Sequence, residues 1–243
     1  MKTNITTLLI IFILLPSIKT NAQDEPTMSG VIRQYQSTLL AFQKIKRLLK
    51  DEKKDNSIDF ESIKGSPYLN EKFSLGKLYI YDSLIDNNLF RYNIYSDEIE
   101  VTENNQLYGL YKVKGMKLML DNQTLVLKNY QENSKSKNKS YFIVLSEGKN
   151  ISLYKRKKCK LTPAQKATTP NQMDRAAKFN IYEDYYIKKE NDEHLYKIST
   201  KERNILKIMQ DKKEIVKNYI DKHNINLKNE KKLTELFTFY NSL

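Results

Sequence analysis

The sequence predicts an α+β fold, in which an antiparallel β-meander sheet or half-open barrel carries an N-terminal helix and a C-terminal three-helix segment. Residues 65–198 alternate short runs of β-branched and aromatic residues with polar turns, which is the pattern of successive antiparallel strands. Residues 28–54 and 199–243 instead repeat apolar residues at intervals of three and four, the spacing of amphipathic helices. We therefore divide the chain into a signal peptide at 1–22, an N-terminal helical segment at 23–64, an antiparallel β domain at 65–198, and C-terminal helices at 199–243.

The first segment has the three parts of a secretory signal peptide. Lys2 provides the positive start, residues 8–15 form an apolar run, and small residues lead up to Ala22. The apolar run is shorter than the about 20 residues that span a bilayer, which favours cleavage over an uncleaved anchor. We predict cleavage between Ala22 and Gln23, no transmembrane segment afterwards, and export to the periplasm or the extracellular space.

The N-terminal helical segment contains one predicted amphipathic helix at 28–54. Its apolar stripe consists of Ile32, Tyr35, Leu39, Phe42, Ile45, Leu48 and Leu49. Such a stripe most often covers a sheet, because tertiary packing supplies most of the stability of a helix. The alternative is a basic helix that lies on a membrane surface.

The strands of the β domain are separated by residues that favour turns. Gly65 and Pro67 mark a turn ahead of a strand at 78–81, and the mostly polar residues 82–88 predict a loop. In the next strand, at 89–95, apolar side chains recur at every second position, so one face should be buried. Further strands are expected at 98–102, 106–113, 116–120, 124–130, 141–145, 151–154, 179–188 and 193–198.

A basic run and an irregular segment follow the strand at 151–154. Residues 155–160 carry basic side chains on both faces, which predicts an edge strand protected against sheet-to-sheet association. Cys159, the single cysteine, excludes an intramolecular disulfide. Basic neighbours would lower the pKa of an exposed thiol, but we favour a buried, inert one. Residues 162–178 predict either a lid or partner-binding loop or a simple crossover.

The C-terminal segment carries three helix-start signals. Ser199 with Glu202, and Asp211 with Glu214, have the spacing of capping boxes, and Asn229 is a third N-cap candidate. Helices of this length are marginal alone, so we expect them to dock on the sheet.

The formal net charge of +13 indicates attraction to polyanions. Lysine supplies most of this excess, whereas bidentate recognition of phosphate favours arginine. We therefore predict no nucleic-acid partner, and an envelope glycan, lipid or protein remains as the partner class.

The sequence contains no recognisable catalytic constellation. His194 and His223 are the only histidines, and neither has a second ligand at metal-binding spacing. There is no glycine-rich phosphate loop and no nucleophile elbow. Asp97, Glu98 and Glu100 could act as acid and base, but the face shared by Glu98 and Glu100 is predicted to be solvated. We predict no enzymatic activity, no cofactor and no metal.

Tyrosine is abundant, with 17 residues, whereas tryptophan is absent. Tyrosine rings can stack on sugars or partners, although tyrosine is also an ordinary strand former. We predict a non-catalytic β-rich binding module for an apolar or glycan ligand, with Tyr92, Tyr185 and Tyr186 in the site. The alternative is a structural component of the cell envelope that binds anionic polymers or a protein partner.

Several short motifs carry a family resemblance. They lie at residues 66–69, 91–97, 184–187, 211–214 and 240–243, and the stretch RYNIYSDEIE is the most specific among them. Together they resemble a family of uncharacterised secreted proteins of Bacteroidota over residues 65–243. The chain departs from that family at 82–88, where an Asp-Gly turn would be expected. The resemblance implies export and a shared architecture, and it implies no activity.

Overall fold

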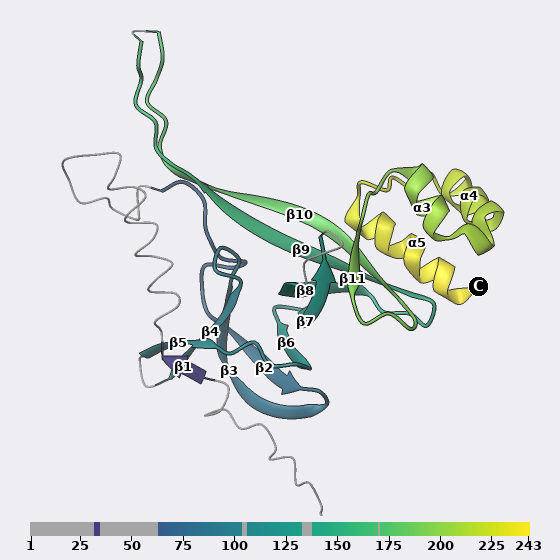
Figure 1. The fold of residues 1–243 in the computed structure, drawn as a ribbon, viewed down its shortest axis with the longest axis horizontal. Helices are drawn as coiled ribbons and strands as arrows, with labels where there is room; N and C mark the ends of the chain where they lie inside the picture. Colours follow the sequence, from purple (N-terminus) through teal and green to yellow (C-terminus); the bar gives the residue numbers. More distant parts are fainter. Residues whose placement is uncertain (1–31, 35–62, 104–105, 133–137, 170) are drawn as a thin grey trace, which may run out of the picture.

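The computed structural model describes residues 32–34, 63–103, 106–132, 138–169 and 171–243 (Figure 1). The predicted signal peptide, with its cleavage site between Ala22 and Gln23, lies outside these residues and stays a prediction. Most of the predicted helix at 28–54 lies outside them as well.

Strand β1, Ile32–Gln34, falls inside the region for which the sequence predicted that helix. It pairs antiparallel with β5, Gln106–Leu110, with Ile32 opposite Leu110. The helix prediction is wrong at these three residues. Backbone pairing with β5, which would otherwise be an open edge, outweighs the local periodicity here.

The other strands are β2 Ser74–Ile80, β3 Ser83–Asn93, β4 Glu98–Glu103, β6 Met116–Leu120, β7 Gln123–Gln131, β8 Asn138–Ser146, β9 Ile151–Thr162, β10 Lys178–Lys189 and β11 Leu195–Ile198. They form one sheet in the order β1-β5-β4-β3-β2-β6-β7-β11-β10-β9-β8. All neighbours are antiparallel except β7 and β11. Strand β7 also pairs with β8, so the strands β7, β11, β10, β9 and β8 close into a ring. The strands β1, β5, β4, β3, β2 and β6 form an open sheet that continues from β7 beside this ring. The predicted α+β class with a large, mostly antiparallel sheet is confirmed.

The topology produces two separate sheet cores. The open sheet buries a large cluster that includes Leu78, Phe90 and Leu118. The ring encloses a second cluster, made of Val126, Tyr130, Phe142, Tyr154, Tyr186 and Leu195. The rings of Phe142 and Tyr186 meet edge to face, with 5.0 Å between their centroids. As in other small barrels, side chains fill the interior.

The loop predicted at 82–88 is wrong, because β3 begins at Ser83 and pairs with the full length of β2. The chain reverses instead at Tyr81 and Asp82, where Tyr81 takes a positive φ of 53°. The first half of β3 is largely exposed, so its polar side chains remain hydrated while the backbone pairs with β2.

The edge-strand prediction for residues 155–160 is wrong only at Lys155, because from Arg156 onward β9 pairs with β10 alone among the described strands and its other edge is free. Strand β9 pairs with β10 over twelve residues and with β8 at Leu153–Lys155, and Lys155 is buried. The irregular segment predicted at 162–178 continues this hairpin. Gln165 and Arg175 exchange backbone hydrogen bonds of 2.8 and 2.7 Å. The result is a long two-stranded extension that projects from the body of the protein (Figure 1).

The C-terminal segment forms the three predicted helices, α3 Glu202–Ile208, α4 Lys213–Lys222 and α5 Glu230–Ser242, with a short 3₁₀ turn η2 at Gln210–Lys212. Their apolar side chains share a cluster with Ile151, Leu153 and Ile187 of β9 and β10, so the helices dock on the sheet. None of the helices in the described part of the chain is long and apolar enough to cross a membrane.

One of the three predicted caps is confirmed. The Asn229 side chain accepts a hydrogen bond from the backbone N–H of Lys232 at the start of α5. The two capping boxes are wrong, since α3 and α4 have no side-chain cap. Asp211 lies in η2 and accepts the Tyr240 hydroxyl at 2.7 Å, so tertiary contact with α5 takes the carboxylate that was expected to cap α4.

Candidate functional site: a lysine-lined cavity at a fork in the sheet

Strand β7 changes its neighbour halfway along its length. On one edge its first half pairs with β6, ending at Val126 opposite Lys117, and its second half pairs with β11, beginning at Tyr130 opposite Leu195. Residues 127–129 lie between the two, and within the described chain no strand pairs with their free edge. We call this point, where the open sheet and the ring separate, the fork.

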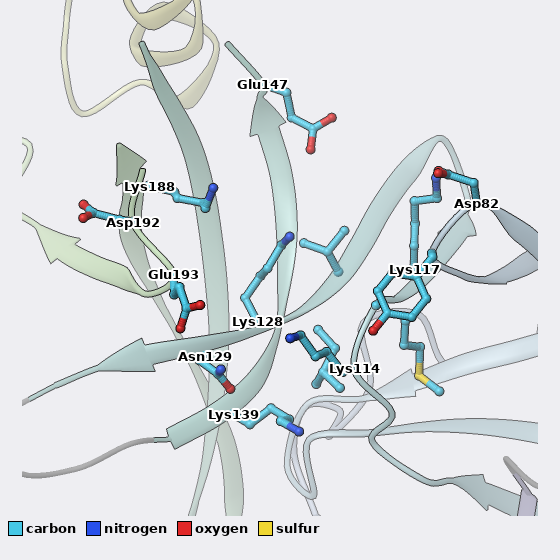
Figure 2. Close-up of a pocket in the computed structure, with 15 residues that line it drawn as sticks. Asp82, Lys114, Lys117, Lys128, Asn129, Lys139, Glu147, Lys188, Asp192 and Glu193 are labelled. Atoms are coloured by element: carbon cyan, nitrogen blue, oxygen red, sulfur yellow. The ribbon is translucent and has the colours of Figure 1, made fainter. Parts of the chain in front are cut away.

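A cavity of about 540 Å³ lies at the fork. Its five lysines are Lys114, Lys117, Lys128, Lys139 and Lys188. Its four carboxylates are Asp82, Glu147, Asp192 and Glu193. They come from strands and turns that are distant in sequence but meet where β6 leaves β7 (Figure 2). The volume falls within the roughly 300–1,000 Å³ range of small-ligand sites.

Lys128 and Lys188 lie on the strand faces that point to the interior of the ring. Lys128 lies between Val126 and Tyr130 on the same face of β7, and Lys188 lies two residues beyond Tyr186 on β10. Since alternate residues of a strand share a face, both lysines continue an otherwise apolar surface into the cavity. Both are half-buried.

The environment of Lys128 disfavours its charged form. Burial lowers its pKa most, and the neighbouring Lys188 lowers it further, while Glu147 acts in the opposite direction. Figure 2 shows Lys128 of β7 and Lys114 of the turn before β6 pointing into the cavity. None of the five lysines forms an ion pair with a carboxylate among the described residues.

One wall of the cavity is fixed by a close backbone approach. Gly115 has a φ of 84°, and a Cβ at this position would lie 2.7 Å from the ring of Tyr81. The N–H of Tyr81 donates to the carbonyl of Gly115 at 2.9 Å. Lys117 lies over the ring of Tyr79, 4.9 Å from its centroid. The turns that carry Lys114 and Asp82 are therefore held together.

The three tyrosines predicted as a ligand site lie elsewhere. Tyr92 is 2% exposed in the core of the open sheet and donates its hydroxyl to Asp97 Oδ1 at 2.7 Å. Tyr186 is 0% exposed inside the ring. Tyr185 points to the other side of β10, where its hydroxyl approaches Glu230 at 3.5 Å. The structure does not bring the three together, and none lines the cavity. Ligand binding by these residues stays a prediction.

The solvated face predicted for Glu98 and Glu100 is wrong, because both side chains are buried. Glu100 accepts hydrogen bonds from Arg91 Nε at 3.0 Å, from Arg91 Nη2 at 2.6 Å and from Asn93 Nδ2 at 3.0 Å. Asp97 accepts the Tyr92 hydroxyl and pairs with Lys112. These partners occupy the carboxylates that could have served as acid and base.

His223 and Cys159, two further groups considered from the sequence, lie in surroundings that suit a structural role. His223 is the C-cap of α4, with its ring centroid 4.3 Å from that of Tyr219. Burial raises the pKa of the Cys159 thiol to about 11, in agreement with an inert thiol. Among the described residues, no group of three or more His, Cys, Asp or Glu side chains could hold a metal ion.

The sequence reasoning missed the lysines of the cavity, although a local signal exists for two of them. Lys128 lies between the inward-facing Val126 and Tyr130, and Lys188 lies two residues beyond the inward-facing Tyr186. A cation at such a position is uncommon unless it is paired or functional. Lys114, Lys117 and Lys139 carry no such signal, because only the fold brings them to the fork.

A scan against protein-family models, a search of curated proteins and a search of solved structures found no match to this chain. The resemblance to secreted proteins of Bacteroidota therefore stays a prediction.

Proposed function

We propose that the protein is a non-catalytic binding module whose cavity takes the acidic end of a glycan, a short oligosaccharide that bears carboxylates. The observation that carries this proposal is the pair Lys128 and Lys188, two half-buried lysines that face one cavity and raise each other's electrostatic energy. A bound anion between them would remove this repulsion.

The rest of the lining favours a sugar acid over an apolar ligand. The five lysines provide donors, and the four carboxylates provide acceptors for hydroxyl groups. Lysine is a compact point charge that suits a carboxylate without demanding the planar geometry of arginine. An apolar ligand would leave these charged groups desolvated and unpaired, which is costly.

The proposal agrees with export, which we propose from the signal-peptide pattern at 1–22. Acidic glycans are polymers of cell surfaces and envelopes, so a periplasmic or extracellular module would meet them. No nucleic acid is proposed as a partner, for the scarcity of arginine described above. The alternative, a structural envelope component without a small-ligand site, predicts no binding at the cavity.

Calorimetric titration with trigalacturonate tests the proposal, with neutral galactotriose as the uncharged probe. We expect binding of the acidic trisaccharide only. The variants K128M and K188M, which keep most of the side-chain volume, should each weaken it by about tenfold or more, as for loss of a partly desolvated ion pair. K207M, at an exposed position of α3, is the matched control and should bind as the parent does. Equal binding of both sugars, or parent-like binding by K128M, would refute the proposal.

A further inference from the structure

The extension of β9 and β10 forms a separate surface, which we call the arm, residues 157–169 and 171–183. Strand β8 pairs with β9 no further than Lys155, and β11 pairs with β10 no further than Tyr185. Beyond these positions the two strands pair with each other, and they project from the body (Figure 1). An isolated ribbon of this length is marginal in water unless one face is packed.

One face of the arm is packed against the body. It carries Cys159, Leu161 and Phe179, which cluster with Ile63 and Tyr95. These contacts hold the base of the arm against the body. The opposite face of the arm takes no part in this packing.

The opposite face carries cations and one tyrosine. Lys160, Lys178 and Tyr182 are exposed on it, with Tyr182 at 50%. Lys64 forms an isolated parallel β-bridge with Lys178 of β10, so these two side chains emerge side by side. Lys160 Nζ lies over the ring of Tyr182, 5.9 Å from its centroid. We call these four residues the cationic face.

The lysines closer to the body are neutralised, whereas those of the cationic face are not. Lys157 pairs with Glu183 at 3.1 Å, and Lys158 pairs with Asp184. Among the described residues, Lys64, Lys160 and Lys178 form no ion pair with a carboxylate. Like charges on directly opposite strand positions destabilise a sheet. The arm therefore carries an unfavourable arrangement that an anionic partner would relieve.

We propose that the cationic face binds an acidic polysaccharide that lies across the arm. A chain of sugar acids presents carboxylates at regular intervals, and its ring faces can stack on Tyr182. A nucleic acid fits less well, because its binding surfaces combine arginines with several stacked aromatic side chains, and this face has lysines and a single tyrosine. None of these residues lines the cavity, so the inference does not depend on the proposed function.

The test is binding of the full-length protein to immobilised polygalacturonate, measured by biolayer interferometry at low and at physiological salt. The triple variant K64Q/K160Q/K178Q should lose about tenfold or more in affinity, since three exposed charges are removed together. The control K207Q/K213Q/K231Q removes the same charge from exposed helix positions and should change affinity by less than about threefold. Y182A should weaken binding by about threefold or more.

The same experiment separates the arm from the cavity. Because the proposed cavity site also binds galacturonate, K64Q/K160Q/K178Q is compared with its parent in the K128M background, where it should still lose about tenfold or more in affinity. Equal losses in the two triple variants would overturn the proposal, because net charge alone would then explain binding. It would also be overturned if K128M lost polymer binding while the arm variant kept it, or if duplex DNA of equal charge bound the cationic face more tightly than polygalacturonate. Circular dichroism and thermal melting of each variant identify any loss of affinity that results from misfolding.

Discussion

The substitution of Glu100 by glutamine should destabilise the protein strongly. Glu100 is 0% exposed, and its carboxylate accepts two hydrogen bonds from Arg91 and one from Asn93. The guanidinium of Arg91 is in turn enclosed between the rings of Tyr68 and Phe73, at 3.7 and 4.3 Å from their centroids. The neutral amide of E100Q can present only its N–H donors or its uncharged oxygen to the Arg91 guanidinium. The guanidinium therefore loses its negatively charged partner.

The magnitude follows from the cost of an uncompensated buried charge. Removal of one partner from a buried ion pair costs about 3–5 kcal/mol, whereas replacement of both partners by apolar groups is often neutral or stabilising. E100Q should therefore lower the free energy of unfolding by about 3–5 kcal/mol. The double variant R91M/E100L should recover most of this loss.

Urea unfolding monitored by circular dichroism measures the effect. With a slope of about 2 kcal/mol per M, the midpoint should fall by roughly 1.5–2.5 M at an unchanged slope. D221N, which breaks the exposed pair of Asp221 with Lys217 on α4, is the control and should cost about 0.5 kcal/mol or less. A loss below about 1 kcal/mol in E100Q would refute the reasoning that the buried charge needs its partner.

Three further predictions concern the C-terminal helices and Cys159. G148A should cost about 1–3 kcal/mol in urea unfolding, because the new Cβ would lie 2.1 Å from the side chain of Asn241, which bonds the backbone N–H and C=O of Ile151. N241A should cost a similar amount, and a double variant that costs no more than either single one would confirm that the two act through one contact. The pKa of Tyr240 is raised to about 12 by burial and by its hydrogen bond to an aspartate, so its stabilising contribution is complete below about pH 10 and is lost as pH rises toward 12. Y240F should flatten this part of the stability profile, and an unchanged profile would contradict the assignment. The half-buried thiol of Cys159, with a pKa of about 11, should react with Ellman's reagent at about pH 8 much more slowly in the native protein than after unfolding in urea, and equal rates would contradict the raised pKa.

Features determined by near neighbours in the sequence were predictable. The strands predicted at 116–120 and 124–130 leave a turn between them, and there Asp121 and Asn122 adopt φ values of 49° and 60°, a left-handed conformation that these residue types tolerate. The Asn229 cap was found for a similar local reason. Both signals lie within a few residues of the element that they define.

Features determined by distant strands were not predictable. The charged run of β9 resembled an edge strand from its start, yet at Lys155 both β8 and β10 flank the strand, and Lys155 pairs with Glu230 of α5 at 2.5 Å. The sequence does not show that a helix 75 residues later supplies the carboxylate. The same limitation applies to Glu100, for which the sequence predicted a solvated position. Its partner Arg91 lies on the neighbouring strand, and only the strand pairing shows that the two side chains meet.

The candidate site was the least predictable part, because it exists only where β7 changes partner. The parallel pairing of β11 with β7 begins at Tyr130, and nothing near Tyr130 in the sequence indicates a parallel neighbour that is 65 residues away. The tyrosines chosen from composition were good strand formers that became core. The lysines of the cavity, which resembled the general lysine excess, were the functional candidates.

The cavity and the cationic face share one physical property. In each, lysines that have no carboxylate partner in the described chain are held near one another by rigid strands, Lys128 beside Lys188 and Lys64 beside Lys178. Two lysines on a flexible loop could move apart and so reduce their electrostatic repulsion. Backbone pairing fixes the positions of these lysines and prevents such movement. A fold that neutralises Lys155, Lys157 and Lys158 with carboxylates could have treated these lysines in the same way. Many exposed lysines of the described chain also lack a carboxylate partner, so what distinguishes these two places is that the backbone holds lysines beside each other, and it is this arrangement for which we propose anion binding.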